Sequence, residues 1–245
     1  MALLGNMTLL GIETATRMSS VALICDQGPE AELRLAEGMQ PSDHLLPLID
    51  RLLTAQGCTL SALSAIAIST GPGSYTGLRV GLSSAQGLAM GSKIPLVAVP
   101  TLWAMASAFL GIPSLIAPMV PARRGFIHWA LFEVIPIMRQ IHPNTVSSLE
   151  DALSVIATYG HERRCETLFA GEIDRERILE SGITAQFTPP ALEIPSAIFV
   201  ARQGLIRFKN GEATPPETVV PVYGEIFRGG DAHRGAHPQL KSSSA

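Results

Sequence analysis

The residues best suited to chemistry lie in short turns that follow apolar runs. The first turn, after the run at residues 7–12, carries Glu13, Thr14 and Thr16. A carboxylate and two hydroxyls beside exposed backbone N–H groups can wrap a phosphate or hold a metal-bound water. An ordinary polar turn has the same composition, and the residues alone favour that simpler interpretation. Glu13, Thr14 and Thr16 are therefore candidate phosphate-binding residues.

A second turn, Gly71-Pro72-Gly73, separates an apolar run at residues 65–69 from a predicted helix. A strand, a glycine turn and a helix N-terminus together resemble a phosphate-binding loop. The Walker A ending is absent because Leu78, not lysine, follows Gly77. The G-x-G-x-x-G spacing also fails, since Gly77 comes one place late. Motif chemistry therefore supports anion binding here only weakly.

A third turn, at residues 121–125, carries Arg123 and Arg124. Paired arginines in a turn can bind an anion, but they are more often solvated or ion-paired. His128 is the one histidine near this turn, and packing on a strand suits it better than reactivity. A peptidase needs a nucleophile–base pair or a metal. We therefore predict no catalytic and no metal-binding residues in this chain.

Composition limits the functional classes. The chain has 245 residues, 47% of them apolar and only 16% charged, which is typical of a globular protein with an apolar surface or a hidden interface. Its formal net charge is −3 and it has no basic run, so it is not expected to carry the main phosphate-binding surface for RNA. The three cysteines (Cys25, Cys58 and Cys165) are widely spaced, which favours a reduced, cytoplasmic protein.

No targeting segment is expected, because no basic stretch precedes the first apolar residues. The uncharged segment between Lys93 and Arg123 is long enough to cross a bilayer. Prolines and a glycine divide it into pieces as short as single strands and helices. We predict buried core here and no membrane contact.

A predicted helix at residues 75–90 repeats small residues every four positions, at Gly77, Gly81, Ala85 and Ala89. Each interior glycine costs a helix about 1 kcal/mol relative to alanine. The missing side chains would allow close approach, either by a partner helix or by the chain's own sheet.

The earlier predicted helix, residues 42–56, has leucines over a wider arc than one sheet needs, which suggests contact on a second side. We predict that both helices bind a partner protein, through Leu45, Leu46, Ile49, Leu52, Leu53, Tyr75, Gly77, Leu78, Gly81, Ser84, Ala85 and Leu88.

The order of the predicted elements indicates an α/β fold with two related lobes. Three strands in hairpins are followed by strands joined through helices, which are expected to be parallel. The strand–turn–strand at residues 115–133 resembles the opening one, with Pro121 standing where Glu13 stands. We assign residues 1–111 to a first lobe with the partner-binding helices, 112–227 to a second lobe, and 228–245 to a disordered tail.

Several motifs together resemble the TsaB (YeaZ) family. They occur in that family's order, strongly over residues 9–125 and thinly afterwards: LGIETAT with SVAL, STGPGSYTGLRVG with AQGLAMG, VPTL, ARRG and PVY. The resemblance implies an actin-like, Hsp70-like ATPase fold of two lobes. It also implies a non-catalytic accessory subunit in the synthesis of threonylcarbamoyladenosine at position 37 of tRNA. In that family the two helices flagged above, residues 42–56 and 75–90, face the catalytic paralogue TsaD.

The resemblance further implies assembly with the ATPase TsaE and contact with tRNA only through the complex. Two departures from the family pattern argue against a nucleotide–metal site within the chain. The first turn reads Glu13-Thr14-Ala15 instead of Asp-Thr-Ser, and Pro121 replaces the usual aspartate of the second turn. The segment at residues 101–108 also lacks the histidine pair of the catalytic paralogue. We expect no stably bound cofactor, with ATP or ADP entering only at the level of the complex.

Two alternatives remain open from the sequence. One is an autonomous enzyme of the same fold, such as a kinase or a peptidase. The other is a homodimeric scaffold that uses the same helices, because apolar helix faces self-associate when a partner is absent.

Overall fold

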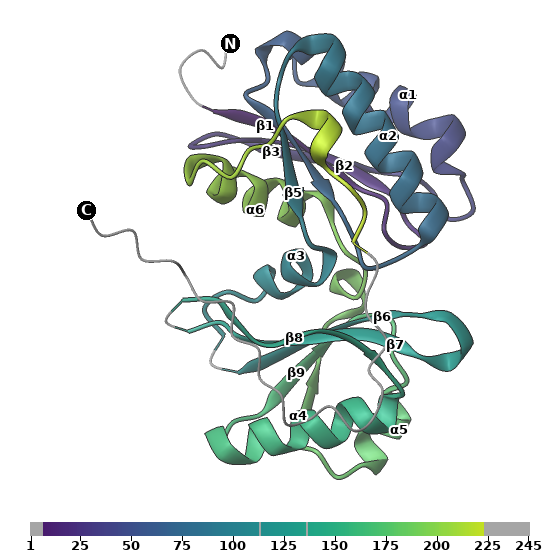
Figure 1. Ribbon diagram of the computed structural model, residues 1–245, viewed down its shortest axis with the longest axis vertical. Coiled ribbons are helices and arrows are strands. Elements are labelled where there is room, and N and C mark those ends of the chain that lie inside the picture. Colours follow the sequence, from purple (N-terminus) through teal and green to yellow (C-terminus); the bar gives the residue numbers. More distant parts are fainter. Residues whose placement is uncertain (1–6, 113, 136, 223–245) are drawn as a thin grey trace.

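The computed structural model describes residues 7–112, 114–135 and 137–222, which form two lobes, each with its own β-sheet (Figure 1). The predicted tail at residues 228–245 lies outside these residues. Each sheet has five strands, and helices pack on both sheets. The expected two-lobed α/β fold is confirmed.

In the first sheet, β1 lies between an antiparallel and a parallel neighbour. β2 and β3 continue antiparallel on one side of β1, and β4 and β5 continue parallel on the other. The strands are β1 (Thr8–Glu13), β2 (Ser20–Cys25), β3 (Glu30–Arg34), β4 (Ala65–Ser69) and β5 (Leu96–Val99). Side chains alternate between the two faces of a strand, so Leu10 and Leu9 enter different core clusters.

Helices cover both faces of this sheet, which explains why β1, β2 and β4 are buried throughout. Helices α1 (Pro41–Ala55) and α2 (Tyr75–Ser92) lie on one face, and α6 (Ala197–Lys209) lies on the other (Figure 1). The short α3 (Thr101–Ser107) contacts both α6 and the second sheet, so it lies between the lobes.

The second sheet repeats the topology of the first. Its order, β8-β7-β6-β9-β10, matches β3-β2-β1-β4-β5 strand for strand. The strands are β6 (Leu115–Pro121), β7 (Ile127–Glu133), β8 (Arg139–Ser147), β9 (Thr167–Ala170) and β10 (Ala185–Phe187). Helices α4 (Leu149–Arg163) and α5 (Arg175–Glu180) accompany it, and single 3₁₀ turns occur at Leu60–Ala62, Arg123–Gly125, Pro190–Leu192 and Pro216–Thr218. The repeat inferred from one hairpin therefore extends over the whole sheet.

The chain returns to the first lobe at α6, although the sequence assigned residues 112–227 to the second. Glycines make this return possible, because a Cβ on Gly204 would lie less than 3.0 Å from Ala67 of β4. Polar contacts fix the start of α6: the Ala197 N–H donates to Ser20 Oγ at 2.9 Å, and Ser196 Oγ donates to Glu32 Oε1 at 2.7 Å. The first lobe is therefore built from both ends of the chain.

The uncharged segment between Lys93 and Arg123 contains β5, α3 and β6, which are largely buried. Over the described ranges, no helix combines the length and the apolar character needed to cross a membrane.

Candidate functional site: two strand-end turns and the outer face of α2

Glu13 is the last residue of β1, and its side chain is fully buried. One carboxylate oxygen accepts a hydrogen bond from the Ala15 N–H, and the Ser69 side chain also contacts the carboxylate. Burial outweighs these bonds and raises the pKa of Glu13 to about 7 from its usual 4.5. The other oxygen, Oε2, has no hydrogen-bond partner among the described residues.

The residues after Glu13 fill the space that the glycines of α2 leave open. A Cβ on Gly77 would lie less than 3.0 Å from the Thr14 carbonyl oxygen, and one on Gly81 would lie as close to Thr14 Oγ1. Gly73, just before the helix, approaches the Ala15 carbonyl in the same way. The predicted partner-facing role of Gly77 and Gly81 is therefore corrected: these glycines admit the chain's own first turn.

The same packing occupies the N-terminus of α2. The Ser74 N–H donates to the Ala15 carbonyl at 2.6 Å, and the Gly77 N–H donates to Ser74 Oγ at 3.2 Å. These are groups that a phosphate would use at a helix N-terminus. Of the predicted phosphate-binding residues, Glu13 and Thr14 are fully buried and only Thr16 is partly exposed. The residues of the first turn therefore pack against α2.

The predicted partner-binding residues divide into an inner and an outer set. The inner set lies in the core of the first lobe and comprises Leu45, Ile49, Leu52, Leu53, Gly77, Leu78, Gly81 and Ala85. The outer set comprises Leu46 and Tyr75, each about half exposed, with Ser84 and Leu88 partly buried. Most of the predicted partner-binding residues therefore face the core of the first lobe, and only the outer set is placed where a partner could contact it.

The outer face of α2 carries a second small-residue stripe, Ser83, Gly87 and Gly91, at four-residue spacing. Within the described part of the chain, a Cβ on Gly87 or Gly91 would meet no atom of another segment within 4 Å. Large exposed side chains lie at both ends of this helix: Met90 is 61% exposed, and Tyr75 carries the Arg79 guanidinium 5.1 Å above its ring centroid. In the sequence, Gly87 marks this outer stripe, because it does not fall on the four-residue spacing of the inner stripe.

The turn between β6 and β7 occupies the equivalent place in the second lobe. Pro121 ends β6 as Glu13 ends β1, but Pro121 is exposed. Arg123 and Arg124 follow in an exposed 3₁₀ turn, and Arg124 has a φ of 61°. The turn is closed by the Ala122 N–H donating to the Phe126 carbonyl at 2.8 Å. This turn is thus open to solvent where the first is buried.

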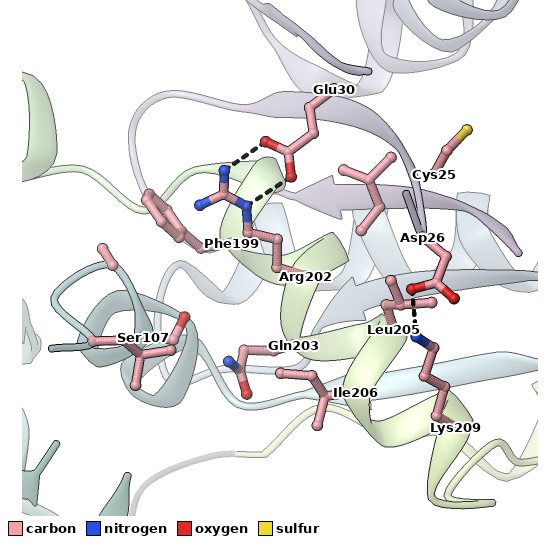
Figure 2. A pocket seen from close by; sticks show the side chains of 13 residues that line it. Cys25, Asp26, Glu30, Ser107, Phe199, Arg202, Gln203, Leu205, Ile206 and Lys209 are labelled. Carbon is pink, nitrogen blue, oxygen red and sulfur yellow. Dashed lines mark hydrogen bonds and ion pairs between the residues drawn. The ribbon is translucent and has the colours of Figure 1, made fainter. Parts of the chain in front are cut away.

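A cavity of about 480 Å³ lies between α6, α3 and the end of β2 (Figure 2). That volume is in the range of small-molecule sites. Its charged side chains neutralise one another: Arg202 donates to both carboxylate oxygens of Glu30, and Lys209 pairs with Asp26. The charges that would orient a ligand are therefore already engaged.

The described part of the chain contains no group of three or more His, Cys, Asp or Glu side chains placed to hold a metal ion. The three cysteines are free thiols, and Cys25 is buried. Burial lowers the pKa of His128, whose ring lies on β7.

Comparison with known proteins gives the family. The family model described as "TsaD: tRNA N6-adenosine threonylcarbamoyltransferase" matches residues 40–200, more than half of the chain. The chain is also 38% identical over 133 residues to the "tRNA threonylcarbamoyladenosine biosynthesis protein TsaB" of Escherichia coli K12. It belongs to the TsaB (YeaZ) family. The match to the E. coli protein covers 52% of this chain and 55% of that protein, so the chain spans about half the length of this TsaB relative.

The TsaB assignment agrees with the fold. The structure of YeaZ from Pseudomonas aeruginosa superposes with a TM-score of 0.70 at 25% identity and covers 89% of this chain and 99% of that one. A "tRNA N6-adenosine threonylcarbamoyltransferase" of Syntrophobacter fumaroxidans is 30% identical over 193 residues, which is 77% of this chain and 53% of that protein. This TsaB-family chain is thus also related to TsaD.

Proposed function

We propose that this chain is a non-catalytic accessory subunit that binds TsaD and activates it for threonylcarbamoyl transfer to adenosine 37 of tRNA. The named relatives support a role in the synthesis of this tRNA modification. TsaE and tRNA would join through the assembled complex. ATP or ADP would bind only at that level, because the chain's own Thr14 and Ala15 occupy the space beside the α2 N-terminus.

The observation that carries the proposal is the exposed glycine in the middle of α2. An interior helical glycine costs about 1 kcal/mol relative to alanine. Gly77 and Gly81 offset that cost by admitting Thr14, but a Cβ on Gly87 would touch nothing among the residues that the structure describes. Close approach of another protein's helix along Ser83, Gly87 and Gly91 would supply the missing gain. The exposed Leu46, Tyr75 and Met90 would supply apolar contact around it.

The test is Gly87→Leu, which places a bulky side chain on the outer stripe. The isolated chain should fold normally, since open space surrounds the position. Binding to TsaD should weaken by about 100-fold or more, because the two backbones could no longer approach. Isothermal titration calorimetry with purified TsaD measures the effect.

The control is Ala157→Leu, which introduces the same side chain at an exposed position of α4 in the second lobe. It should leave binding unchanged. Activation is measured by tRNA modification with TsaD and TsaE, with and without this chain. Equal affinity of Gly87→Leu and the unaltered chain would refute the docking surface. ATP turnover by the isolated chain would refute the accessory role.

The same exposed residues favour a second candidate, a homodimer formed when TsaD is absent. Light scattering coupled to size-exclusion chromatography separates the two cases. A dimer that dissociates when TsaD is added indicates that both interfaces use the outer face of α2. A dimer that persists in the presence of TsaD supports the scaffold instead.

A further inference from the structure

The β6–β7 turn presents two adjacent arginines that form no ion pair with any described residue. Both Arg123 and Arg124 are exposed. Most other arginines of the described ranges are paired with carboxylates, for example Arg17 with Glu37 and Glu172. No acidic residue occurs within residues 121–127. The two positive charges are therefore not neutralised locally.

The acidic residue that follows the neighbouring strand β9, Glu172, already has an ion-pair partner. Gly171, just after β9, packs against Met119 of β6. The next residue, Glu172, accepts a hydrogen bond from Arg17 Nε at 2.5 Å. Its carboxylate is thus paired with the first lobe.

The backbone holds the arginines in a fixed turn. The Ala122 N–H donates to the Phe126 carbonyl at 2.8 Å, and the Phe126 N–H donates to the Arg123 carbonyl at 3.2 Å. Arg124 has a φ of 61°, a region that glycine or asparagine adopts at lower cost. Neither side chain makes a hydrogen bond or an ion pair within the described chain that offsets that cost. The turn therefore holds the two backbone positions in place and leaves both guanidinium groups available to an external anion.

An exposed aromatic ring accompanies the charges. Phe126 is 39% exposed at the end of the same turn. Arginines bind phosphate oxygens through charged hydrogen bonds, and aromatic rings stack on unpaired bases. This combination fits single-stranded or looped RNA better than an acidic protein surface, which has no planar base to stack.

We propose that the β6–β7 turn (Arg123, Arg124 and Phe126) is an RNA contact of this chain, which binds backbone phosphates of the tRNA in the assembled complex. The inference rests on the proposed function, because it assumes that tRNA reaches the complex. It is a local contact, which is compatible with a chain of net charge −3. It also assigns direct tRNA binding to a subunit that was expected to meet tRNA only through its partners.

The experiment measures binding of unmodified tRNA transcript to the complex of this chain with TsaD. The variant is Arg123→Gln combined with Arg124→Asn, since asparagine tolerates positive φ. Affinity should fall about tenfold, and the slope of log K against log salt should flatten by about 1.5, since two phosphate contacts are lost. A variant with lysine at both positions should have the salt slope of the unaltered chain, because both positive charges are present again.

The matched control is Arg164→Asn. Arg164 is also exposed, has a φ of 51° and has no ion pair among the described residues, but it caps α4 in the second lobe. It should leave affinity and salt slope unchanged. Two results would overturn the inference: an unchanged salt slope in the double variant, or an equal loss of slope in the control.

Loss of TsaD binding in the double variant would also overturn it, by assigning the turn to a protein interface. The proposed function is tested separately, with the unaltered chain. If that chain neither binds TsaD nor stimulates modification, the accessory role fails whatever the arginine variants do.

Discussion

The two lobes share one strand order, yet the turns at equivalent strand ends have opposite environments. Glu13 ends β1 in full burial, and the two residues after it pack against α2. Pro121 ends β6 in the open, and the residues after it are exposed. The difference originates in the neighbouring helices, because α2 has 18 residues and inward glycines whereas its counterpart α5 has six residues.

Equivalent positions of a duplicated fold can therefore have different roles. In the first lobe the turn contributes to stability, because it fills the glycine-lined surface of α2. In the second lobe the glycine just after β9, Gly171, packs against strand β6, and residues 123–126 of the turn are exposed. A surface turn is free to contact other molecules.

The largest expected effect is that of Gly77→Ala. The added methyl group would overlap the Thr14 carbonyl, so we expect a loss of about 3 to 5 kcal/mol in the free energy of unfolding. Gly87→Ala, in the same helix, should instead gain up to about 1 kcal/mol, because open space surrounds it. Urea unfolding measures both. Equal effects of the two substitutions would show that the first turn is not packed against α2.

The next largest effect is the pH dependence of stability that the buried Glu13 carboxylate causes. Because the pKa of Glu13 is raised to about 7 from 4.5, the folded chain holds a proton that the unfolded chain releases. The free energy of unfolding should therefore fall by roughly 2 to 3 kcal/mol as the pH rises from about 5 to about 7, and then level off. Glu13→Gln should abolish this decline, and unfolding curves across this pH range measure it.

The matched variant in the second lobe is Pro121→Glu. An exposed carboxylate at that strand end keeps an ordinary pKa, so it should add no decline in stability between about pH 5 and about pH 7. A decline of equal size in Glu13→Gln and the unaltered chain would show that another group is responsible.

The smallest effect distinguishes the paired from the unpaired arginines. Arg17 joins the first turn to Glu172 of the second lobe, but the Arg17 side chain is 46% exposed. Arg17→Gln should cause a small loss of stability at low salt and a smaller one at high salt. Arg123→Gln should cost nothing measurable, since no ion pair is lost. Thermal unfolding at two salt concentrations compares them, and a larger loss from Arg123→Gln would contradict its unpaired state.

Local signals were enough to predict most elements of the first lobe. The strand β4 has the predicted bounds, because it is an apolar run that ends at turn residues. Strand β8 was missed because it is partly exposed and contains Pro143, which breaks the pattern expected of a strand. Strand β10 has three residues, too few for any periodicity.

The sequence predicted the two helices of the candidate site but not which of their faces is buried. Spacing reveals that Gly77 and Gly81 share a face, but it does not reveal what covers that face. The answer depends on Thr14, which lies more than sixty residues away in the chain and is brought to α2 by the pairing of β1 with β4. The return of α6 was missed for the same reason, since an amphipathic helix shows that it has a buried face and not which sheet it covers.

Because α6 closes one face of the first sheet, that lobe stays incomplete during synthesis until residue 209 has left the ribosome. Until then Leu9, Ala65 and Val97 lack the cover that Val200 and Ala201 later provide. The intervening second lobe is free to fold first, which reverses the usual order from N-terminus to C-terminus. A fragment ending at residue 111 would accordingly expose this apolar face and aggregate.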